Sequence, residues 1–103
     1  MQAIEIVRIY VREGGDEAGL SLMEQVFALL HDRHKIQGLT VFRGIAGFGI
    51  HGEVHAADLL HMSARLPLVI EFFDTPEAVT AALAALQGLI PSGHIVKWPA
   101  LCL

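Results

Sequence analysis

A run of closely spaced glycines lies near the middle of the chain, preceded by an arginine and followed by a histidine-rich segment. Glycine permits unusual φ values and has no Cβ, so such a backbone lets an anionic ligand approach its amide groups closely. The same glycines also suit a bend where a strand leaves its sheet, and the two roles are compatible. The residues that we expect to bind a small ligand are Arg43, Gly44, Gly47, Phe48, Gly49 and Arg65.

These ligand-binding residues have plainer alternatives. Arg43 and Arg65 would also be satisfied by salt bridges to Glu71 or Asp74, and Phe48 would stack on a base or pack on a neighbouring chain. The glycine run is not a dinucleotide-binding fingerprint, because no helix follows it at once to receive a pyrophosphate.

Two imidazoles and a carboxylate follow the glycines, at His51, Glu53 and His55. Side chains of these types are suitable ligands for zinc, copper or nickel. Gly52 weakens any helix that would bring the two histidines together at i and i+4. A divalent-metal site on this segment and a set of solvated histidines are therefore alternatives.

Residues for catalysis are sparse. No serine or cysteine lies in a nucleophile-type turn with a base fixed nearby, and Cys102 lies close to the last residue. The acids Glu5 and Glu71 and the bases Arg8 and Arg43 lie on expected strands. Acids and bases placed in this way in an oligomer core neutralise each other more often than they perform chemistry. We therefore expect a protein that is not an enzyme.

The elements that position these residues alternate between strand and helix. Ser21 with Glu24 predicts the start of a first helix, and Gly38 is placed to end it in the left-handed conformation. Thr75 and Pro76 predict the start of a second helix. Runs of β-branched and aromatic residues predict strands at 3–12, 39–43, 66–73 and 94–98.

The resulting order, βαββαβ, predicts a single domain over residues 1–103 with an α+β, ferredoxin-like sandwich. Four antiparallel strands would form one sheet, and two helices would cover one of its faces. Residues 50–64 show no clear strand or helix period and are expected to form a long loop.

Both faces of the expected sheet are apolar. Within residues 66–73 one alternating set is wholly apolar and should face the helices, while the opposite set is still mostly apolar. Leaving that second face in water would forgo several kcal/mol at about 25 cal/mol per Å² of apolar area. The sequence therefore predicts an obligate homo-oligomer. The two sets are Leu66, Leu68, Ile70 and Phe72, and Pro67, Val69, Glu71 and Phe73.

Composition agrees with this expectation and narrows the class of protein. The chain is 53% hydrophobic and 17% charged, and its net charge of -4 gives no reason to expect nucleic acid or an acidic membrane surface. A single cysteine excludes an internal disulfide. Residues 1–8 carry an acid and a base where a signal peptide would be apolar, and residues 78–96 are interrupted by turn residues. We expect a cytoplasmic protein that is not integral to a membrane.

The element order and several local motifs resemble the PII-like signalling superfamily. The resemblance is strongest to its uncharacterised branch, the domain-of-unknown-function family 190, and it covers nearly the whole chain. The glycine-rich block is its most specific part. The matching residues are Val7 to Tyr10, Gly38 to Gly49, His55, Leu66 to Glu71 and Asp74.

Membership of this superfamily implies a homotrimer whose sheets face inward, with small-molecule sites in the clefts between subunits. It also implies a regulatory role in which the 50–64 loop docks on a protein target, such as a transporter or an enzyme. The sequence departs from PII proteins at Ile50, which replaces a basic residue, and at residues 91–94, where the lysine of the phosphate-binding loop is missing. The latter segment offers backbone amides without positive charge. The ligand is therefore left open, with a nucleotide among the candidates. The alternative is a CutA-like trimer that binds divalent metal through His51, Glu53 and His55.

Overall fold

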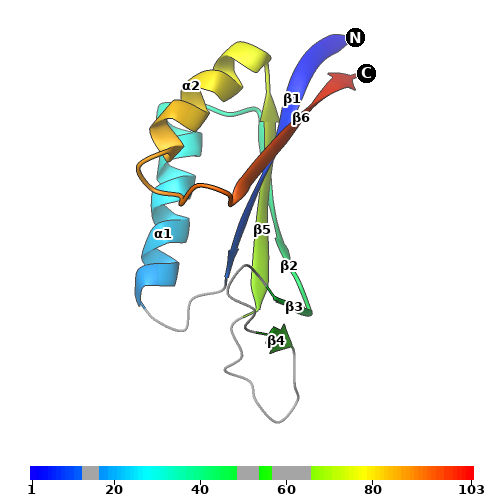
Figure 1. Ribbon diagram of the computed structural model, residues 1–103. Helices are drawn as coiled ribbons and strands as arrows, with labels where there is room; N and C mark the ends of the chain where they lie inside the picture. The colour runs from blue at the N-terminus through cyan, green and yellow to red at the C-terminus, as the bar shows by residue number, and fades with distance from the viewer. Residues whose placement is uncertain (13–16, 49–53, 57–65) are drawn as a thin grey trace.

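The fold is a four-stranded antiparallel sheet with helices on one of its faces (Figure 1). The computed structural model describes residues 1–12, 17–48, 54–56 and 66–103. The strand order is β2-β5-β1-β6, and a further pair, β3 and β4, forms a separate two-stranded sheet. The expected ferredoxin-like α+β sandwich is confirmed. The elements are β1 (Gln2–Arg12), α1 (Glu17–Phe27), the π-helix η1 (Ala28–Arg33), β2 (Gly38–Arg43), β3 (Ala46–Phe48), β4 (Val54–Ala56), β5 (Pro67–Asp74), α2 (Pro76–Leu86) and β6 (Ile95–Cys102).

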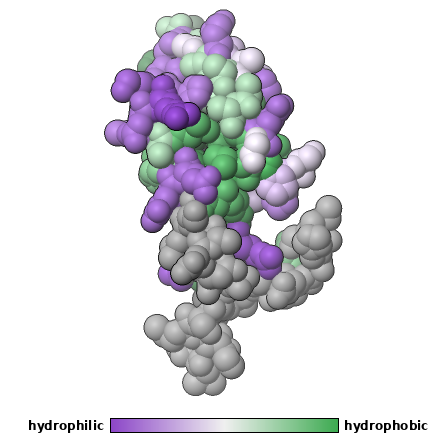
Figure 2. Space-filling model, turned by 90° about the vertical axis from the view of Figure 1, so that its left-hand side faces the viewer, coloured by the Kyte–Doolittle hydropathy of each residue, from purple (hydrophilic) through white to green (hydrophobic). Residues whose placement is uncertain are grey.

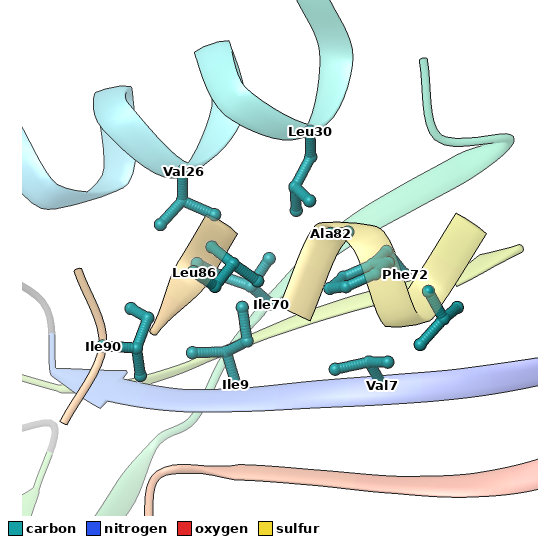
Figure 3. Close-up of a cluster of buried hydrophobic side chains, with 10 residues drawn as sticks. Val7, Ile9, Val26, Leu30, Ile70, Phe72, Ala82, Leu86 and Ile90 are labelled. Atoms are coloured by element: carbon teal, nitrogen blue, oxygen red, sulfur yellow. The ribbon is translucent and has the colours of Figure 1, made fainter. Parts of the chain in front are cut away.

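The hydrophobic core lies between the sheet and the helices (Figure 3). Leu68, Ile70 and Phe72 of β5 and Leu66 just before it are buried, as the alternation predicts. In the register of the sheet, Val7 of β1 lies opposite Phe72, and Ile9 lies opposite Ile70. The two central strands therefore present one continuous apolar surface to the helices.

Side chains from the helices pack against this surface and complete the core. Val26 of α1 and Leu30 of η1 are fully buried, four residues apart on the same helical stripe. From α2 and the turn after it come Val79, Leu86 and Ile90, also buried. In Figure 3 the side chains of Val26 and Leu30 point from the helix toward the sheet, and Leu86 lies beside Ile70. Burial of each such side chain contributes about 1.5–3 kcal/mol.

The start of α2 is fixed by side-chain hydrogen bonds. Thr75 is the N-cap, and its Oγ1 accepts a hydrogen bond of 3.2 Å from the backbone N–H of Ala78, as its position before Pro76 predicts. The buried carboxylate of Asp74 accepts from the backbone N–H of Thr75 at 2.7 Å and from that of Gln37 at 2.9 Å. Asp74 thus ties the entry to β2 to the beginning of α2.

The boundaries expected for the first helix were wrong at both ends. The helix begins at Glu17, so Ser21 lies inside it rather than at its cap. At the other end the chain leaves through a wide turn, in which the His34 N–H bonds to the Leu29 carbonyl at 3.0 Å, and the left-handed residue is Lys35 with φ of 49°. Gly38 is instead the first residue of β2.

Gly38 has a packing role in place of the expected helix-ending one. A Cβ added there would lie 3.2 Å from the ring of Phe73, its partner in the β2–β5 register. The missing side chain therefore makes room for an aromatic ring. The helix ends earlier, at the turn that contains His34 and Lys35.

A short hairpin corrects the expectation of a loop without regular structure at residues 50–64. Val54–Ala56 forms β4 and pairs antiparallel with β3, placing Gly47 opposite His55. In Figure 1 this hairpin lies at the end of the sheet that is farthest from the two termini.

The side covered by helices has a mixed surface. Figure 2 looks onto this side and shows hydrophilic side chains around a hydrophobic centre.

Among the described residues, no helix is long and apolar enough to cross a lipid bilayer.

Candidate functional site

The glycine run turns the chain tightly across the beginning of β5. The N–H of Gly44 donates a hydrogen bond of 2.7 Å to the carbonyl of Pro67. A Cβ on Gly44 would lie 2.7 Å from Cγ of Pro67, and one on Gly47 would lie 3.1 Å from the same atom. Gly44 is therefore required by its close approach to the proline ring, and Gly47 lies tightly against the same ring. We call Gly44, Gly47 and Pro67 the glycine corner. Sequence reasoning placed Pro67 on a strand but missed its contact with the glycines, although its place at the start of a strand after a long loop was a usable signal.

The other described ligand candidates lie around this corner without closing on one point. Arg43 is the last residue of the edge strand β2 and is exposed, opposite Leu68 in the register. Phe48 of β3 is 76% exposed, and Ile45, in the turn between β2 and β3, is 79% exposed. The hairpin thus presents apolar side chains to its surroundings, beside a cation.

Gly49, His51, Glu53 and Arg65 lie outside the described residues, and for His55 only the backbone of β4 is described. Within the described part of the chain, no three His, Cys, Asp or Glu side chains cluster closely enough to hold a metal ion.

The two carboxylates considered as partners for Arg43 and Arg65 have other contacts. Glu71 pairs with Arg8, at 2.7 Å between Oε1 and Nε. Asp74 accepts hydrogen bonds from Gln37 and Thr75, as described above. The expectation that strand acids neutralise strand bases therefore holds for Arg8 and Glu71.

The second notable surface is the sheet face that neither helix covers, which we call the open face (Figure 1). The alternation of the strands and their register place a mainly apolar set of side chains on it. Four of them, Tyr10, Phe42, Val96 and Trp98, are among the exposed large hydrophobic residues. The open face includes Ile6, Arg8, Tyr10, Arg12, Thr40, Phe42, Pro67, Val69, Glu71, Phe73, Val96 and Trp98.

Its charged centre is the Arg8–Glu71 pair, which lies between two aromatic rings. Cζ of Arg8 lies 5.6 Å from the centroid of Trp98 and 6.0 Å from that of Phe42, within the range of cation–π attraction. The hydrogen bond to Glu71, and after it one to Tyr10, raises the pKa of Arg8. The guanidinium therefore stays charged at every physiological pH. We call Arg8, Glu71, Phe42 and Trp98 the Arg8 cluster.

A shallow hollow of about 490 Å³ lies on the other side of the sheet, between the end of α2 and β6. Its cation, Lys97, is held by the carboxylate of Glu5 at 3.1 and 3.2 Å, and the ring Nδ1 of the adjoining His94 bonds to the carbonyl of Tyr10 at 3.0 Å. These groups are occupied within the chain, which leaves little positive charge for a phosphate. The hollow is lined by Leu83, Gln87, Ile90, Pro91, Ser92, Gly93, Ile95 and Lys97.

Comparison with other sequences yields one protein family. The profile of family DUF190, described as Uncharacterized ACR, matches residues 4–101. The UPF0166 protein MJ1524 of Methanocaldococcus jannaschii is 33% identical over 92 residues, which cover 89% of this chain and 83% of that protein. A UPF0166 protein of Aquifex aeolicus is 29% identical over 84 residues, with 82% and 79% covered.

Solved structures with the same fold include two kinds of protein. CPII of Thiomonas intermedia, bound to ADP and bicarbonate, superimposes with a TM-score of 0.60 at 17% identity, covering 95% of this chain and 84% of that one. The divalent cation tolerance protein CutA1 of Thermus thermophilus has a TM-score of 0.62 at 17% identity, with 97% and 86% covered. At these identities the likeness is one of fold. The family match confirms the resemblance to family 190, and the solved structures show that the chain has the fold of PII-like and CutA1 proteins.

Proposed function

The chain belongs to the DUF190 family, and we propose that it is a non-enzymatic regulatory protein of PII-like type that binds a small ligand between copies of itself. The observation that carries this proposal is the open face, an apolar sheet surface that the chain's own helices leave uncovered. Large apolar patches of this kind mark interaction surfaces in soluble proteins. Three copies with their open faces inward would cover it and would create clefts at the edges of the sheets.

The ligand would bind at the glycine corner. Backbone amides are accessible where side chains are absent, and Arg43 supplies a cation at the same end of the sheet. An anionic small molecule is the class that suits these groups. We include Gly49 and Arg65 in the proposed site as neighbours in sequence of the corner and of β5. Phe48, exposed on β3, would pack against the ligand or the adjacent copy.

Regulation would work by a shift in conformational populations. The β3–β4 hairpin is joined directly to the glycine corner, so a ligand that favours one position of the corner also favours one position of residues 50–64. That segment would then meet a protein target with a different fit in the two states. No bond is made or broken in this scheme.

The test is a thermal-shift screen with ADP, ATP, AMP and bicarbonate, followed by hydrogen exchange with the compound that binds. We choose these probes because the fold neighbour CPII is bound to ADP and bicarbonate. We expect a rise in melting temperature and slower exchange over residues 49–65. Arg43→Gln should weaken the shift, while Arg33→Gln, an exposed arginine on η1, should not. Binding without any change in exchange over residues 49–65 would contradict the regulatory mechanism.

A second candidate function is the binding of divalent metal by a CutA-like trimer. CutA1 proteins are among the fold neighbours, and β4 places the backbone of His55 beside the glycine corner, opposite Gly47. Titration with Zn²⁺ and Cu²⁺ should then give an affinity that falls when His51 and His55 are both changed to Ala. An unchanged affinity would remove this candidate.

A further inference from the structure

We propose that the Arg8 cluster is the recognition centre through which this chain selects a second copy of itself. The inference rests on the oligomer of the proposed function and adds the residues that specify the partner. Its physical basis is an ion pair at the centre of a mainly apolar surface, with an aromatic ring on either side.

The cluster lies in the middle of the open face. Arg8 is on the central strand β1, Glu71 is its register partner on the central strand β5, and the two rings come from the edge strands β2 and β6. In one chain, the side chains of Arg8 and Glu71 are 39% and 29% exposed, so a cover over the face would bury a pair that water still reaches. Arginine and aromatic side chains of this kind are enriched in interface centres and among the residues that dominate binding energy.

The charge of the face favours a second copy over other occupants. At its centre Arg8 and Glu71 neutralise each other within the chain. The register places one further charged side chain, Arg12, at the end of β1 on the same face, and it too has a partner. Single-stranded nucleic acid also stacks on exposed aromatic residues of a sheet, but it requires unpaired positive charge along its backbone. The central cation, Arg8, is already paired with Glu71, Arg12 at the edge also has a partner, and the chain as a whole carries a net charge of -4. A mainly apolar face whose central charges are paired within the chain is complementary to an identical face.

Burial of the Arg8–Glu71 pair on association would make binding selective for the correct partner in the correct register. A buried ion pair adds little net stability, because both charges lose water, but removing one partner leaves an uncompensated charge and is strongly unfavourable. An alternative partner, or the same partner in a shifted register, would separate the pair from the rings or place apolar groups over an unpaired charge. Buried polar groups of this type are known to set register and oligomeric state in other assemblies.

The experiment is a double-mutant cycle on self-association, measured by sedimentation velocity over a range of concentrations. The variants are Arg8→Met, Glu71→Met and the double variant, and circular dichroism confirms that each one is folded. The matched control is Lys97→Met, which breaks the Glu5–Lys97 pair of similar exposure on the opposite side of the sheet.

Each single variant should raise the dissociation constant at least about 100-fold, and the double variant should recover most of that loss. Lys97→Met should change it less than about fivefold, as for an exposed ion pair. Single variants that associate as well as the parent protein would overturn the inference while leaving the oligomer intact. A parent protein that stays monomeric would overturn both.

A second readout does not depend on any variant's folding. Trp98 is the chain's one tryptophan, and it belongs to the cluster. Dilution through the dissociation midpoint should shift its fluorescence emission to longer wavelength and increase its quenching by acrylamide. Equal quenching of the associated and dissociated protein would place the interface elsewhere. Quenching of Trp98 by a single-stranded oligothymidylate would assign the face to nucleic acid and also overturn the inference.

Discussion

The two faces of the main sheet are built from the same four strands, yet only one of them is completed within the chain. On the helix-covered face, Val7, Ile9, Ile70 and Phe72 lose all or nearly all contact with water. On the open face, one residue further along each strand, Tyr10, Phe42 and other large apolar side chains remain exposed. Since the backbone is shared, the difference lies entirely in what packs against each face.

This contrast separates two kinds of stability. Side chains under the helices hold the single chain together, and their loss should unfold it. Side chains on the open face contribute little until another surface covers them, and their loss should change association more than folding. The predictions below follow this division, and the largest effect belongs to the covered face.

Phe72→Ala should destabilise the chain by about 3–5 kcal/mol, because it removes a fully buried ring from the core. The free energy of unfolding is measured in urea. If the protein is an oligomer, the parent and the variant are compared at the same protein concentration. A loss below about 1 kcal/mol would show that the core tolerates a cavity there and would weaken the distinction between the two faces.

Phe42→Ala removes a ring of the same kind from the open face. It should weaken self-association by about 2 kcal/mol or more, and it should alter the unfolding of the dissociated chain by less than about 1 kcal/mol. Comparison of sedimentation with unfolding at low concentration separates the two effects. Equal losses in both experiments would mean that the open face already supports the single chain.

The glycine corner, which joins the sheet to the hairpin, gives a graded series. Gly44→Ala should cost about 1–3 kcal/mol, since the new Cβ would lie 2.7 Å from the ring of Pro67, and Gly47→Ala should cost less at 3.1 Å. Gly88→Ala, with open space around the new methyl group, should change stability by no more than about 1 kcal/mol. The thermal melting order of these three variants tests the close approach, and a neutral Gly44→Ala would refute it.

The smallest predicted effect is at the start of α2. Thr75→Ala removes the cap that anchors one of the two covering helices and should cost about 1 kcal/mol. Thr75→Ser keeps a hydroxyl acceptor and serves as the control. If both variants unfolded at the same urea concentration as the parent protein, the cap would have no part in holding the helix layer on the sheet.

The regular parts of this fold were predictable from local sequence. Alternation along β5 identified the buried set, and Thr75 with Pro76 identified the start of α2, because both signals act over a few residues. The start of α1 and the role of Gly38 were not predictable in this way. The helix begins at Glu17, before the cap motif at Ser21. The lack of a side chain at Gly38 makes room for the ring of Phe73, which lies far away in sequence.

The candidate sites show the same limit. Glycines 44 and 47 were singled out for their type, but their contact with Pro67 depends on how the hairpin returns to the sheet. Acids and bases on the strands were expected to neutralise each other, but which acid meets which base was not predictable. The pairing of Arg8 with Glu71 follows from the β1–β5 register. The rings of Phe42 and Trp98 join them only because four strands are brought together in one order.

Sedimentation equilibrium of the unmodified protein at micromolar concentration tests the central claim, that copies of this chain cover the open face. The account predicts a single species of three times the chain mass of 11.2 kDa. A stable species of one chain mass, folded and without self-association up to the highest soluble concentration, would contradict it.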